Sequence, residues 1–336
     1  MNTSPQYSRF ALVREMMETT DIVRNFNTGR IEDPISSIQS TRRLFFTGEG
    51  SSRIFPAKNA MYHARSAGLD ISMAAEGARQ AMEYDLAGWT VFGASNSGQT
   101  REVIELFTKL KAAGHKGLYS LTANDNTKLQ SLASQGFVLK CGKENAVAAT
   151  KSVVEQALFY QALIAQLAAK PLGSLSNAAQ SVENALTMPI DPAITKKIAS
   201  ASTICFSGRN DGVAEELTLK TNEITRKKSD YFEGTYAVHG VEEVLNADDV
   251  VILVNPFEAE MDKFKTTLTD GVKLTVIAIS DKETIFPTIK IKPAGSLTNL
   301  AYLAAGWNIL VEVGLSLGID LDKPVRARKI GNEFCG

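Results

Sequence analysis

The sequence predicts an α/β protein built from two doubly wound parallel sheets flanked by helices, and three observations support this fold class. Short β-branched or aromatic runs alternate with longer helical patterns, which is typical of parallel sheets with helices on both faces. The two halves of the chain repeat this alternation. A length of 336 residues with 44% hydrophobic content is also enough for two domains of ordinary size.

The expected elements follow in chain order. Residues 10–26 ("FALVREMMETTDIVRNF") predict an N-terminal helix. Expected strands of the first half cover 43–50, 89–95, 117–123 and 136–141, and those of the second half cover 202–209, 249–255, 274–280 and 288–293. Helical patterns separate these runs, so each sheet is expected to be parallel.

A whole-domain repeat underlies the two halves. Phe46 corresponds to Phe206 and Val91 to Val251 at the same offset, and the later strands keep nearly that offset. Such a register indicates a duplicated α/β unit. Pro189 and Pro192 interrupt any helix near the junction. We therefore expect a helical segment at 1–38, one domain at 39–188 and another at 189–336.

Charge and composition exclude several classes of function. A formal net charge of −1 without a basic cluster argues against nucleic-acid binding. The most apolar stretches, 152–169 and 300–318, contain Glu155 and Glu312, so buried helices are expected and not membrane spans. The N-terminus lacks a signal-peptide pattern, which favours the cytoplasm. Three widely spaced cysteines predict no disulfide framework and no metal site.

The loop "GASNSGQT" (93–100) has the chemistry of a phosphate site. It lies between the strand that contains Val91 and a helical pattern starting near Val103, where free N–H groups and the helix dipole favour an anion. Ser95, Asn96, Ser97 and Thr100 add polar side chains. Simple helix capping remains the alternative, because capping alone favours Ser and Thr.

Better-known loop motifs do not fit this stretch. A P-loop requires Gly-Lys-Ser/Thr, and a nucleophile elbow requires a glycine where Ser97 stands. A neighbouring loop, "GEGSS" (48–52), supplies Ser51 and Ser52 after another strand. Two such loops favour a small phosphorylated ligand over a dinucleotide. The corresponding loop of the second half, "LVNPFEAE", lacks the serines.

The helical pattern "VAEELTLKTNEITRK" (213–227) places Lys220 on its apolar face with Glu223 at its flank. The position of Lys220 on the apolar face makes the pair a candidate for a functional role, and a solvated i,i+3 ion pair is the equally open alternative. His239 follows in a glycine-flanked segment. A lone histidine is usually structural or exposed, so the residues alone give it no assigned role.

These stretches together resemble the sugar isomerase (SIS) domain family, in particular the tandem-SIS isomerase portion of glutamine–fructose-6-phosphate aminotransferase. The resemblance rests on the order and spacing of "GEGSS", "SNSGQT", "ENAVAATK", "LTLKTNE", "HG" and "DKPVRARK". It implies two tandem SIS domains. It also implies that Ser95, Asn96, Ser97 and Thr100 bind a sugar phosphate, that Ser51 and Ser52 contact phosphate and sugar hydroxyls, and that Val147 lines the sugar.

The same resemblance implies catalytic positions. Glu223 would be the carboxylate base for proton transfer between C1 and C2, Lys220 would stabilise or reprotonate, and Lys329 would act as an amine on the ketone. His239 would assist ring opening from the neighbouring subunit, so the resemblance implies a homodimer. Ala149 stands where the family often has serine. No metal or other cofactor is required.

The expected activity follows from what the chain has and lacks. No cysteine precedes Cys141, so we expect no glutaminase chemistry. The resemblance then favours a sugar-phosphate isomerase or amino-sugar phosphate deaminase acting on a hexose 6-phosphate. A fructosamine-6-phosphate deglycase and a non-catalytic sugar-phosphate sensor are the alternatives. Phosphorylated sugars or amino sugars are the expected partners, and neither nucleic acid nor membrane is.

Overall fold

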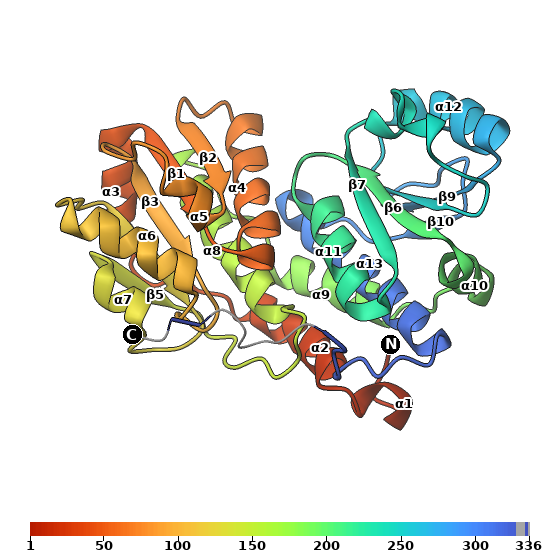
Figure 1. Cartoon of the computed structure of the whole chain (residues 1–336), viewed down its shortest axis with the longest axis horizontal. Coiled ribbons are helices and arrows are strands. Elements are labelled where there is room, and N and C mark those ends of the chain that lie inside the picture. The colour runs from red at the N-terminus through yellow and green to blue at the C-terminus, as the bar shows by residue number, and fades with distance from the viewer. Residues whose placement is uncertain (327–332, 335–336) are drawn as a thin grey trace. The chain divides into compact units, whose positions relative to one another are not determined.

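The computed structural model describes residues 1–326 and 333–334, and its contacts divide the chain into two compact units. The first-sheet unit contains residues 25–144, 149–172 and 333–334. The second-sheet unit contains residues 1–24, 145–148 and 173–326. The elements of each unit are labelled in Figure 1. Both units are discontinuous in sequence, and each is described by itself.

Each unit contains a five-stranded sheet in which the neighbouring strands pair in parallel. The strand order is β2-β1-β3-β4-β5 in one sheet and β7-β6-β8-β9-β10 in the other, so the two sheets have the same topology. This finding confirms the predicted α/β class with parallel sheets. The strands are β1 (Arg43–Thr47), β2 (Ser72–Glu76), β3 (Thr90–Ala94), β4 (Leu118–Thr122), β5 (Gln135–Val138), β6 (Thr203–Gly208), β7 (Lys228–Glu233), β8 (Val250–Val254), β9 (Thr275–Ser280) and β10 (Thr288–Lys290).

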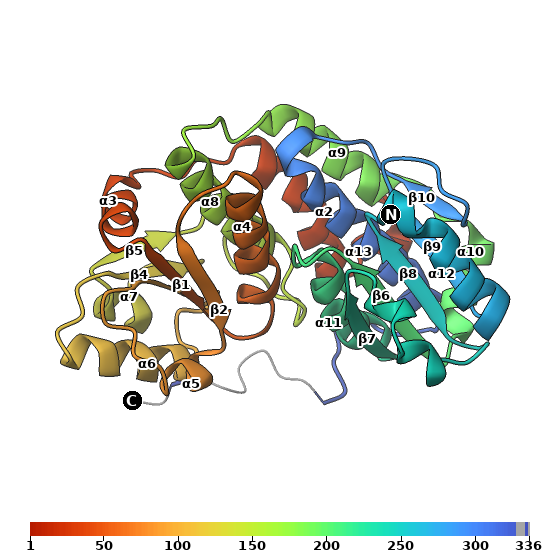
Figure 2. The same ribbon diagram turned by 90° about the horizontal axis from the view of Figure 1, so that it is seen from above.

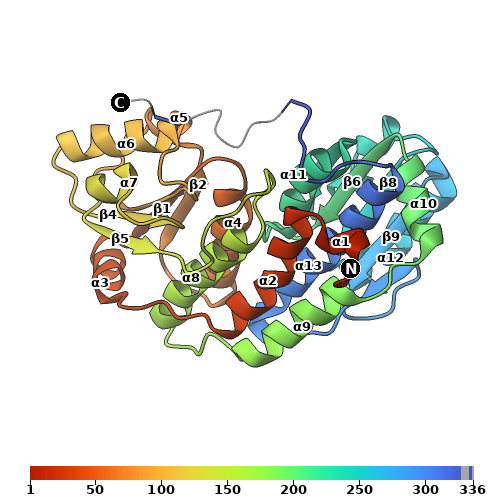
Figure 3. The same ribbon diagram turned by 90° about the horizontal axis from the view of Figure 1, so that it is seen from below.

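Helices cover both faces of the first sheet. Figures 2 and 3 show α5, α6 and α7 on one face and α3, α4 and α8 on the other. Adjacent residues of β1 point to opposite faces of the sheet and pack in different hydrophobic layers. Phe45 packs with Val91 and Phe107, whereas Phe46 contacts the Tyr160 ring of α8. The helices are α3 (Glu32–Thr41), α4 (Ile54–Ser66), α5 (Ala78–Ala81), α6 (Arg101–Ala112), α7 (Lys128–Leu132) and α8 (Lys151–Leu167).

The second sheet is covered in a related way. Phe264 and Leu268, from α12 and a π-helical segment (Lys265–Val272), pack with Val251 and Val276 of the sheet. Helix α11 packs on β6 and on α13, and α9 lies against both α13 and α2 (Figure 3). The helices are α1 (Pro5–Ser8), α2 (Ala11–Arg24), α9 (Leu175–Thr187), α10 (Pro192–Ser200), α11 (Val213–Thr225), α12 (Met261–Phe264) and α13 (Thr298–Ser316), and short 3₁₀ turns occur at 50–52, 236–238, 241–243, 258–260 and 295–297.

Two features of the fold go beyond the sequence patterns. Strands β2 and β7 are not among the expected strands. β2 is an edge strand without a fully buried residue, and β7 is an edge strand in which exposed residues alternate with more buried ones. Contacts also group α2 and α9 with the second sheet. The domains predicted from the sequence instead place α2 in the N-terminal segment 1–38 and α9 in the domain 39–188. The domain boundaries after residues 38 and 188 therefore stay a prediction, which concerns where each repeated α/β unit begins and ends in the sequence.

Candidate active site

The two hydroxyl-bearing loops lie side by side at the carboxyl edge of the first sheet. β1 and β3 are paired neighbours, with Thr47 opposite Gly93, and the chain leaves them toward opposite ends of the sheet. The carbonyl oxygen of Ala94 is only 3.0 Å from where a Cβ on Gly48 would lie, so the two loops approach closely. Ligands of open α/β sheets bind at such a topological switch point.

The loop after β3 is organised by its own hydroxyl groups. Ser95 Oγ and Thr100 Oγ1 are 2.7 Å apart, and Ser95 Oγ also accepts the Gly98 N–H at 3.0 Å. Ser97 Oγ accepts the Gln99 N–H at 3.1 Å. Gly98 has φ +66°, and a Cβ there would lie 2.4 Å from Thr127, so the turn requires glycine. The loop therefore has a fixed, compact shape.

Capping alone does not account for these side chains. Thr100 is the N-cap residue of α6, but its side chain makes no capping hydrogen bond, and its hydroxyl lies against Ser95 instead. The backbone amides of the first turn of α6, from Arg101 onward, follow directly. Such a helix N-terminus favours an anion through its N–H groups and its dipole. The loop thus presents hydroxyls and a helix N-terminus together.

The loop after β1 supplies the second set of hydroxyls. Ser51 is 8% exposed within a 3₁₀ turn, and Ser52 Oγ accepts a hydrogen bond from Gln156 Nε2 of α8 at 3.5 Å. The neighbouring Glu49 carboxylate accepts the Ala78 N–H at 2.9 Å. Partial burial raises the pKa of Glu49, and that hydrogen bond opposes the shift. A carboxyl group therefore borders the two hydroxyl loops.

Glu144 is a buried carboxylate that the sequence patterns did not single out. It accepts hydrogen bonds from Asn96 Nδ2 at 2.6 Å, from the Thr150 N–H at 2.8 Å and from Ser152 Oγ at 2.5 Å. Its 1% exposure makes these donors necessary, since an unpaired buried carboxylate is costly. Glu144 therefore connects Asn96 of the loop to the start of α8.

The second sheet has a different arrangement at its own switch point. Arg209, directly after β6, donates a hydrogen bond to the carbonyl oxygen of Asn255 and lies over the Phe257 ring at 4.3 Å. Asn255 and Phe257 follow β8, which pairs with β6. The side chain of Arg209 thus lies against the loop that corresponds to the serine-rich loop of the first sheet.

Helix α11 carries a buried cluster of charged side chains. Lys220 is fully buried, and its Nζ is 2.7 Å from Glu223 Oε2 and 3.4 Å from Glu216 Oε1. The Glu223 side chain is 24% exposed, whereas Glu216 is fully buried. The Lys220–Glu223 pair is therefore not the solvated surface pair that the spacing also allowed. Glu216 was not anticipated, although it lies one turn before Lys220 on the same face.

This cluster is suited to proton transfer. A lysine ammonium held between two carboxylates is oriented by both through charge-assisted contacts. Glu223 alone of the three reaches solvent, so it is the member able to meet a bound molecule. A carboxylate at a protein surface beside a fixed cation can accept a proton from carbon or oxygen and return it nearby.

His239 lies elsewhere in the second-sheet unit. It follows a 3₁₀ turn (Tyr236–Val238), is exposed, and its Nε2 accepts a hydrogen bond from Lys263 Nζ at 3.0 Å. This contact places His239 with Lys263 at the surface and not with Lys220. Val147 belongs to the same unit and is half-buried in the segment Asn145–Ala148.

The C-terminal tail returns to the first hydroxyl loop. Glu333 forms an antiparallel bridge with Thr100, and the Phe334 N–H donates to Gln99 O at 2.9 Å. Lys329, the remaining predicted site residue, lies outside the described residues 1–326 and 333–334. Within those residues, no three His, Cys, Asp or Glu side chains gather as a metal site requires. No helix in this described part is both long and apolar enough to cross a membrane.

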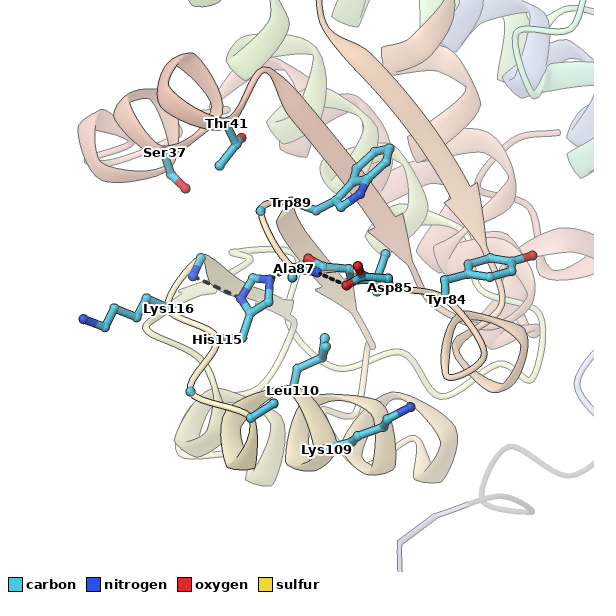
Figure 4. A pocket seen from close by; sticks show the side chains of 15 residues that line it. Ser37, Thr41, Tyr84, Asp85, Ala87, Trp89, Lys109, Leu110, His115 and Lys116 are labelled. Atoms are coloured by element: carbon cyan, nitrogen blue, oxygen red, sulfur yellow. Dashed lines mark hydrogen bonds between the residues drawn. The ribbon is translucent and has the colours of Figure 1, made fainter.

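A separate pocket of about 560 Å³ opens at the opposite edge of the first sheet (Figure 4). Trp89 and Gly117, just before β3 and β4, line it together with Leu110 of α6. His115 fixes its wall, since its Nε2 is 3.1 Å from Leu86 O and its Nδ1 accepts the Gly117 N–H at 3.2 Å. This pocket is remote from the two hydroxyl loops and is not part of the candidate site.

Comparison with known proteins identifies the first-sheet region. Residues 37–166 match the family model of the SIS domain. That range contains both hydroxyl loops and Glu144. The chain is also similar to the glutamine–fructose-6-phosphate aminotransferase (isomerizing) of Shewanella oneidensis, at 26% identity over 254 residues. This alignment covers 68% of the chain but 41% of the relative, so the chain spans about two fifths of that curated protein.

Solved structures share the fold over nearly the whole chain. The C-terminal domain of the glucosamine-fructose-6-phosphate aminotransferase from Francisella tularensis superposes with a TM-score of 0.80 at 18% identity, covering 94% of this chain and 98% of that one. A glucosamine-6-phosphate deaminase from Thermotoga maritima gives a TM-score of 0.71 at 20% identity, covering 95% and 98%. At these identities the likeness shows the α/β fold.

Proposed function

We propose that this protein is a sugar-phosphate isomerase or amino-sugar phosphate deaminase that acts on a hexose 6-phosphate by proton transfer between C1 and C2. The observation that carries the proposal is the meeting of the two hydroxyl loops at the switch point between β1 and β3, within the region that matches the SIS domain. Hydroxyls beside a helix N-terminus favour a phosphate group. A sugar phosphate is the ligand that the matched domain suggests.

The first-sheet loops would hold the phosphate end of the substrate. Ser95, Ser97 and Thr100 line the loop at the N-terminus of α6, and Ser51 and Ser52 face it from the neighbouring strand end. Asn96 would be oriented toward the sugar by Glu144. Val147 would line the sugar itself. In the second sheet, Arg209 lies against the loop after β8, which corresponds to the serine-rich loop of the first sheet. The second-sheet unit would contribute to the reaction through helix α11.

The chemistry is assigned to α11 and its neighbours. Glu223 would remove the proton from one carbon of the opened sugar and return it to the adjacent carbon, passing through an enediol or enamine. Lys220, held 2.7 Å from Glu223, would orient that carboxylate and stabilise or reprotonate the intermediate. Lys329 would attack the ketone as an amine, and His239 would open the ring from the partner subunit of a homodimer.

Relatives support this chemical class. The sequence relative from Shewanella oneidensis is named as an isomerizing aminotransferase of fructose 6-phosphate, and a structural neighbour from Thermotoga maritima is named as a glucosamine-6-phosphate deaminase. Another neighbour, from Escherichia coli, is named as a tagatose-6-phosphate ketose/aldose isomerase. Phosphorylated ketoses, aldoses and amino sugars are common to these names. We also propose a second SIS domain in residues 189–336, because the second sheet has the same strand order as the first, and a cytoplasmic location, because the sequence has no signal-peptide pattern.

The test is hydrogen exchange at the reacting carbons. The purified protein is incubated in deuterated water with glucosamine 6-phosphate, fructose 6-phosphate or a fructosamine 6-phosphate, and NMR follows C1 and C2. Deuterium incorporation without ammonia indicates an isomerase. Release of ammonia with conversion to the ketose indicates a deaminase, and release of a free amine or amino acid indicates a deglycase. Tight binding without any exchange or turnover would replace the proposal with a sensor.

Glu223→Gln tests the assignment of the base. The amide keeps the size of the side chain but cannot accept the proton, so exchange is expected to fall by about 100-fold or more. Glu283→Gln is the matched control, because Glu283 is an exposed surface partner of Lys290. Equal exchange by wild type and Glu223→Gln would remove Glu223 from the mechanism.

A further inference from the structure

Helix α2 carries an acidic side chain on its buried face. Glu15 is 4% exposed, whereas Glu18 on the same helix is exposed. A buried carboxylate is costly unless it is hydrogen-bonded. Its partners therefore indicate why an acidic residue is present in a helix that packs against α9.

Both oxygens of Glu15 bind backbone amides far along the chain. Oε1 accepts the Asn145 N–H, and Oε2 accepts the Ala146 N–H at 3.2 Å. These donors belong to Asn145–Ala148, the short segment that the contacts group with α2 in the second-sheet unit. Hydrogen bonds to a charged acceptor are among the stronger ones in proteins.

The segment that receives this anchor has no regular secondary structure of its own. It lies between β5 and α8, and it contains Val147. Buried backbone amides outside helices and sheets need partners from elsewhere. The residue just before it, Glu144, is fixed separately by Asn96 and the start of α8. The backbone path to Val147 is therefore set on its N-terminal side by Glu15.

We propose that Glu15 is a positioning residue for the sugar-lining segment, acting through the amides of Asn145 and Ala146. The inference rests on the proposed function, because that function makes Val147 part of the sugar site. Glu15 itself touches no substrate. Its carboxylate holds the segment in the path that presents Val147 to the sugar, so loss of the anchor weakens the contact between Val147 and the bound sugar.

The variant Glu15→Gln tests this role. Glutamine preserves the length of the side chain but has one carbonyl oxygen, so only one amide keeps an acceptor. KM for the sugar phosphate is expected to rise about tenfold or more, with kcat changed less, because the sugar contact is lost in the ground state as well as in the transition state. Glu18→Gln, on the exposed face of the same helix, is the control and should leave both constants unchanged.

Hydrogen–deuterium exchange separates positioning from simple loss of stability. In the full-length protein, the peptide containing Asn145 and Ala146 should exchange faster in Glu15→Gln, while peptides from the β1–β3–β4 core keep wild-type rates. Glu15→Asp keeps both acceptor oxygens and is expected to recover part of the KM effect. If Glu15→Gln does not fold, Glu15→Asp carries the same two measurements with smaller expected changes.

The possible outcomes are distinguishable. A raised KM together with local acceleration of exchange supports the role of Glu15. A wild-type KM in the folded fraction of the variant overturns it, whether or not exchange or thermal stability changes. If wild type itself turns over no sugar phosphate, the proposed function fails. In that case local exchange still decides whether Glu15 holds the segment.

Discussion

The hydroxyl oxygens of Ser95 and Thr100 lie 2.7 Å apart across the loop between β3 and α6. This contact draws the first residue after the strand to the N-cap of the helix, so the intervening turn is closed beside the helix N-terminus. The same turn keeps its shape only because Gly98 has a positive φ. This relationship gives the serine-rich loop a defined geometry.

Removing hydroxyls from this loop should weaken the binding of phosphorylated sugars. The double variant Ser97→Ala/Thr100→Ala is expected to raise Kd about 10- to 100-fold, since each lost hydrogen bond costs about 0.7–1.4 kcal/mol. Isothermal titration with fructose 6-phosphate measures the effect, and unphosphorylated fructose is the control ligand. Unchanged affinity would return the loop to a purely structural role.

Glu144 should matter for both stability and binding. In Glu144→Gln the amide group faces donors, so at least one of Asn96, Thr150 and Ser152 loses its acceptor. We expect the free energy of unfolding to fall by about 2–3 kcal/mol, and sugar-phosphate affinity to fall with it. Chemical denaturation and titration report the two quantities. The exposed Glu83→Gln serves as control, and a variant as stable as wild type would contradict the prediction.

The charged cluster of α11 predicts that two substitutions within it lower the free energy of unfolding by different amounts. Lys220→Met leaves Glu216 buried without its cation, which is expected to cost about 3–5 kcal/mol of stability. Glu223→Gln keeps Lys220 paired with Glu216 and affects a side chain that reaches solvent, so the expected cost is about 1 kcal/mol or less. Denaturant unfolding measures both. Equal costs would show that Glu216 does not depend on Lys220.

Asp211 predicts a pH dependence of stability. Burial raises the pKa of its carboxyl to about 6, from an ordinary value of 3.8, against the opposing effects of the Val213 N–H and Arg209. Its stabilising contribution is therefore present at pH values below about 4 and is lost as the pH rises through 6. Asp211→Asn keeps the acceptor for Val213 and removes the charge. The variant should gain about 2–3 kcal/mol relative to wild type between pH 4 and 7.

Unfolding free energies of wild type and Asp211→Asn across that pH range test the prediction. The exposed N-cap residue Asp191 provides the control substitution, Asp191→Asn, which should show no such crossover near pH 6. Parallel curves for wild type and Asp211→Asn would mean that Asp211 ionises normally in the folded protein.

The segment around Asp322, just before the C-terminal tail, predicts a smaller effect on the free energy of unfolding. Asp322 accepts the N–H groups of Ala11 and Leu12 at the start of α2, at 2.6 and 3.0 Å, and Arg226 donates to Asp320 O at 3.1 Å. Asp322→Ala removes this cap and should cost about 1 kcal/mol in unfolding free energy. Asp322→Asn should recover most of it. A fully stable alanine variant would show that the cap contributes nothing.

Much of the fold could be predicted because its signals are local. Each central strand is a compact apolar run, and each hydroxyl loop directly follows one, so their meeting at one sheet edge follows from parallel topology. Strands β2 and β7 could not be predicted because they are edge strands, where few residues are fully buried and polar residues such as Asp230 are tolerated, so neither forms an apolar run.

The anchoring residues of the site could not be found in this way. Glu15 binds amides about 130 positions along the chain, and Asn96 donates to Glu144 from a separate loop. Their significance depends on burial and on backbone donors, and neither leaves a pattern in the neighbouring sequence. Lys220 was the intermediate case, since helical spacing placed it on the apolar face but did not reveal Glu216 as its second partner.

The placement of Asn145–Ala148 limits which fragments of this protein can be expressed with all their hydrogen-bond partners. The matched SIS region, residues 37–166, includes those four residues but excludes the carboxylate that accepts two of their amides. A fragment cut at the boundaries of the repeat would carry both hydroxyl loops and leave those amides without Glu15. The predicted domain at 39–188 is therefore not self-contained, because a helix before it supplies the acceptor for two of its backbone amides.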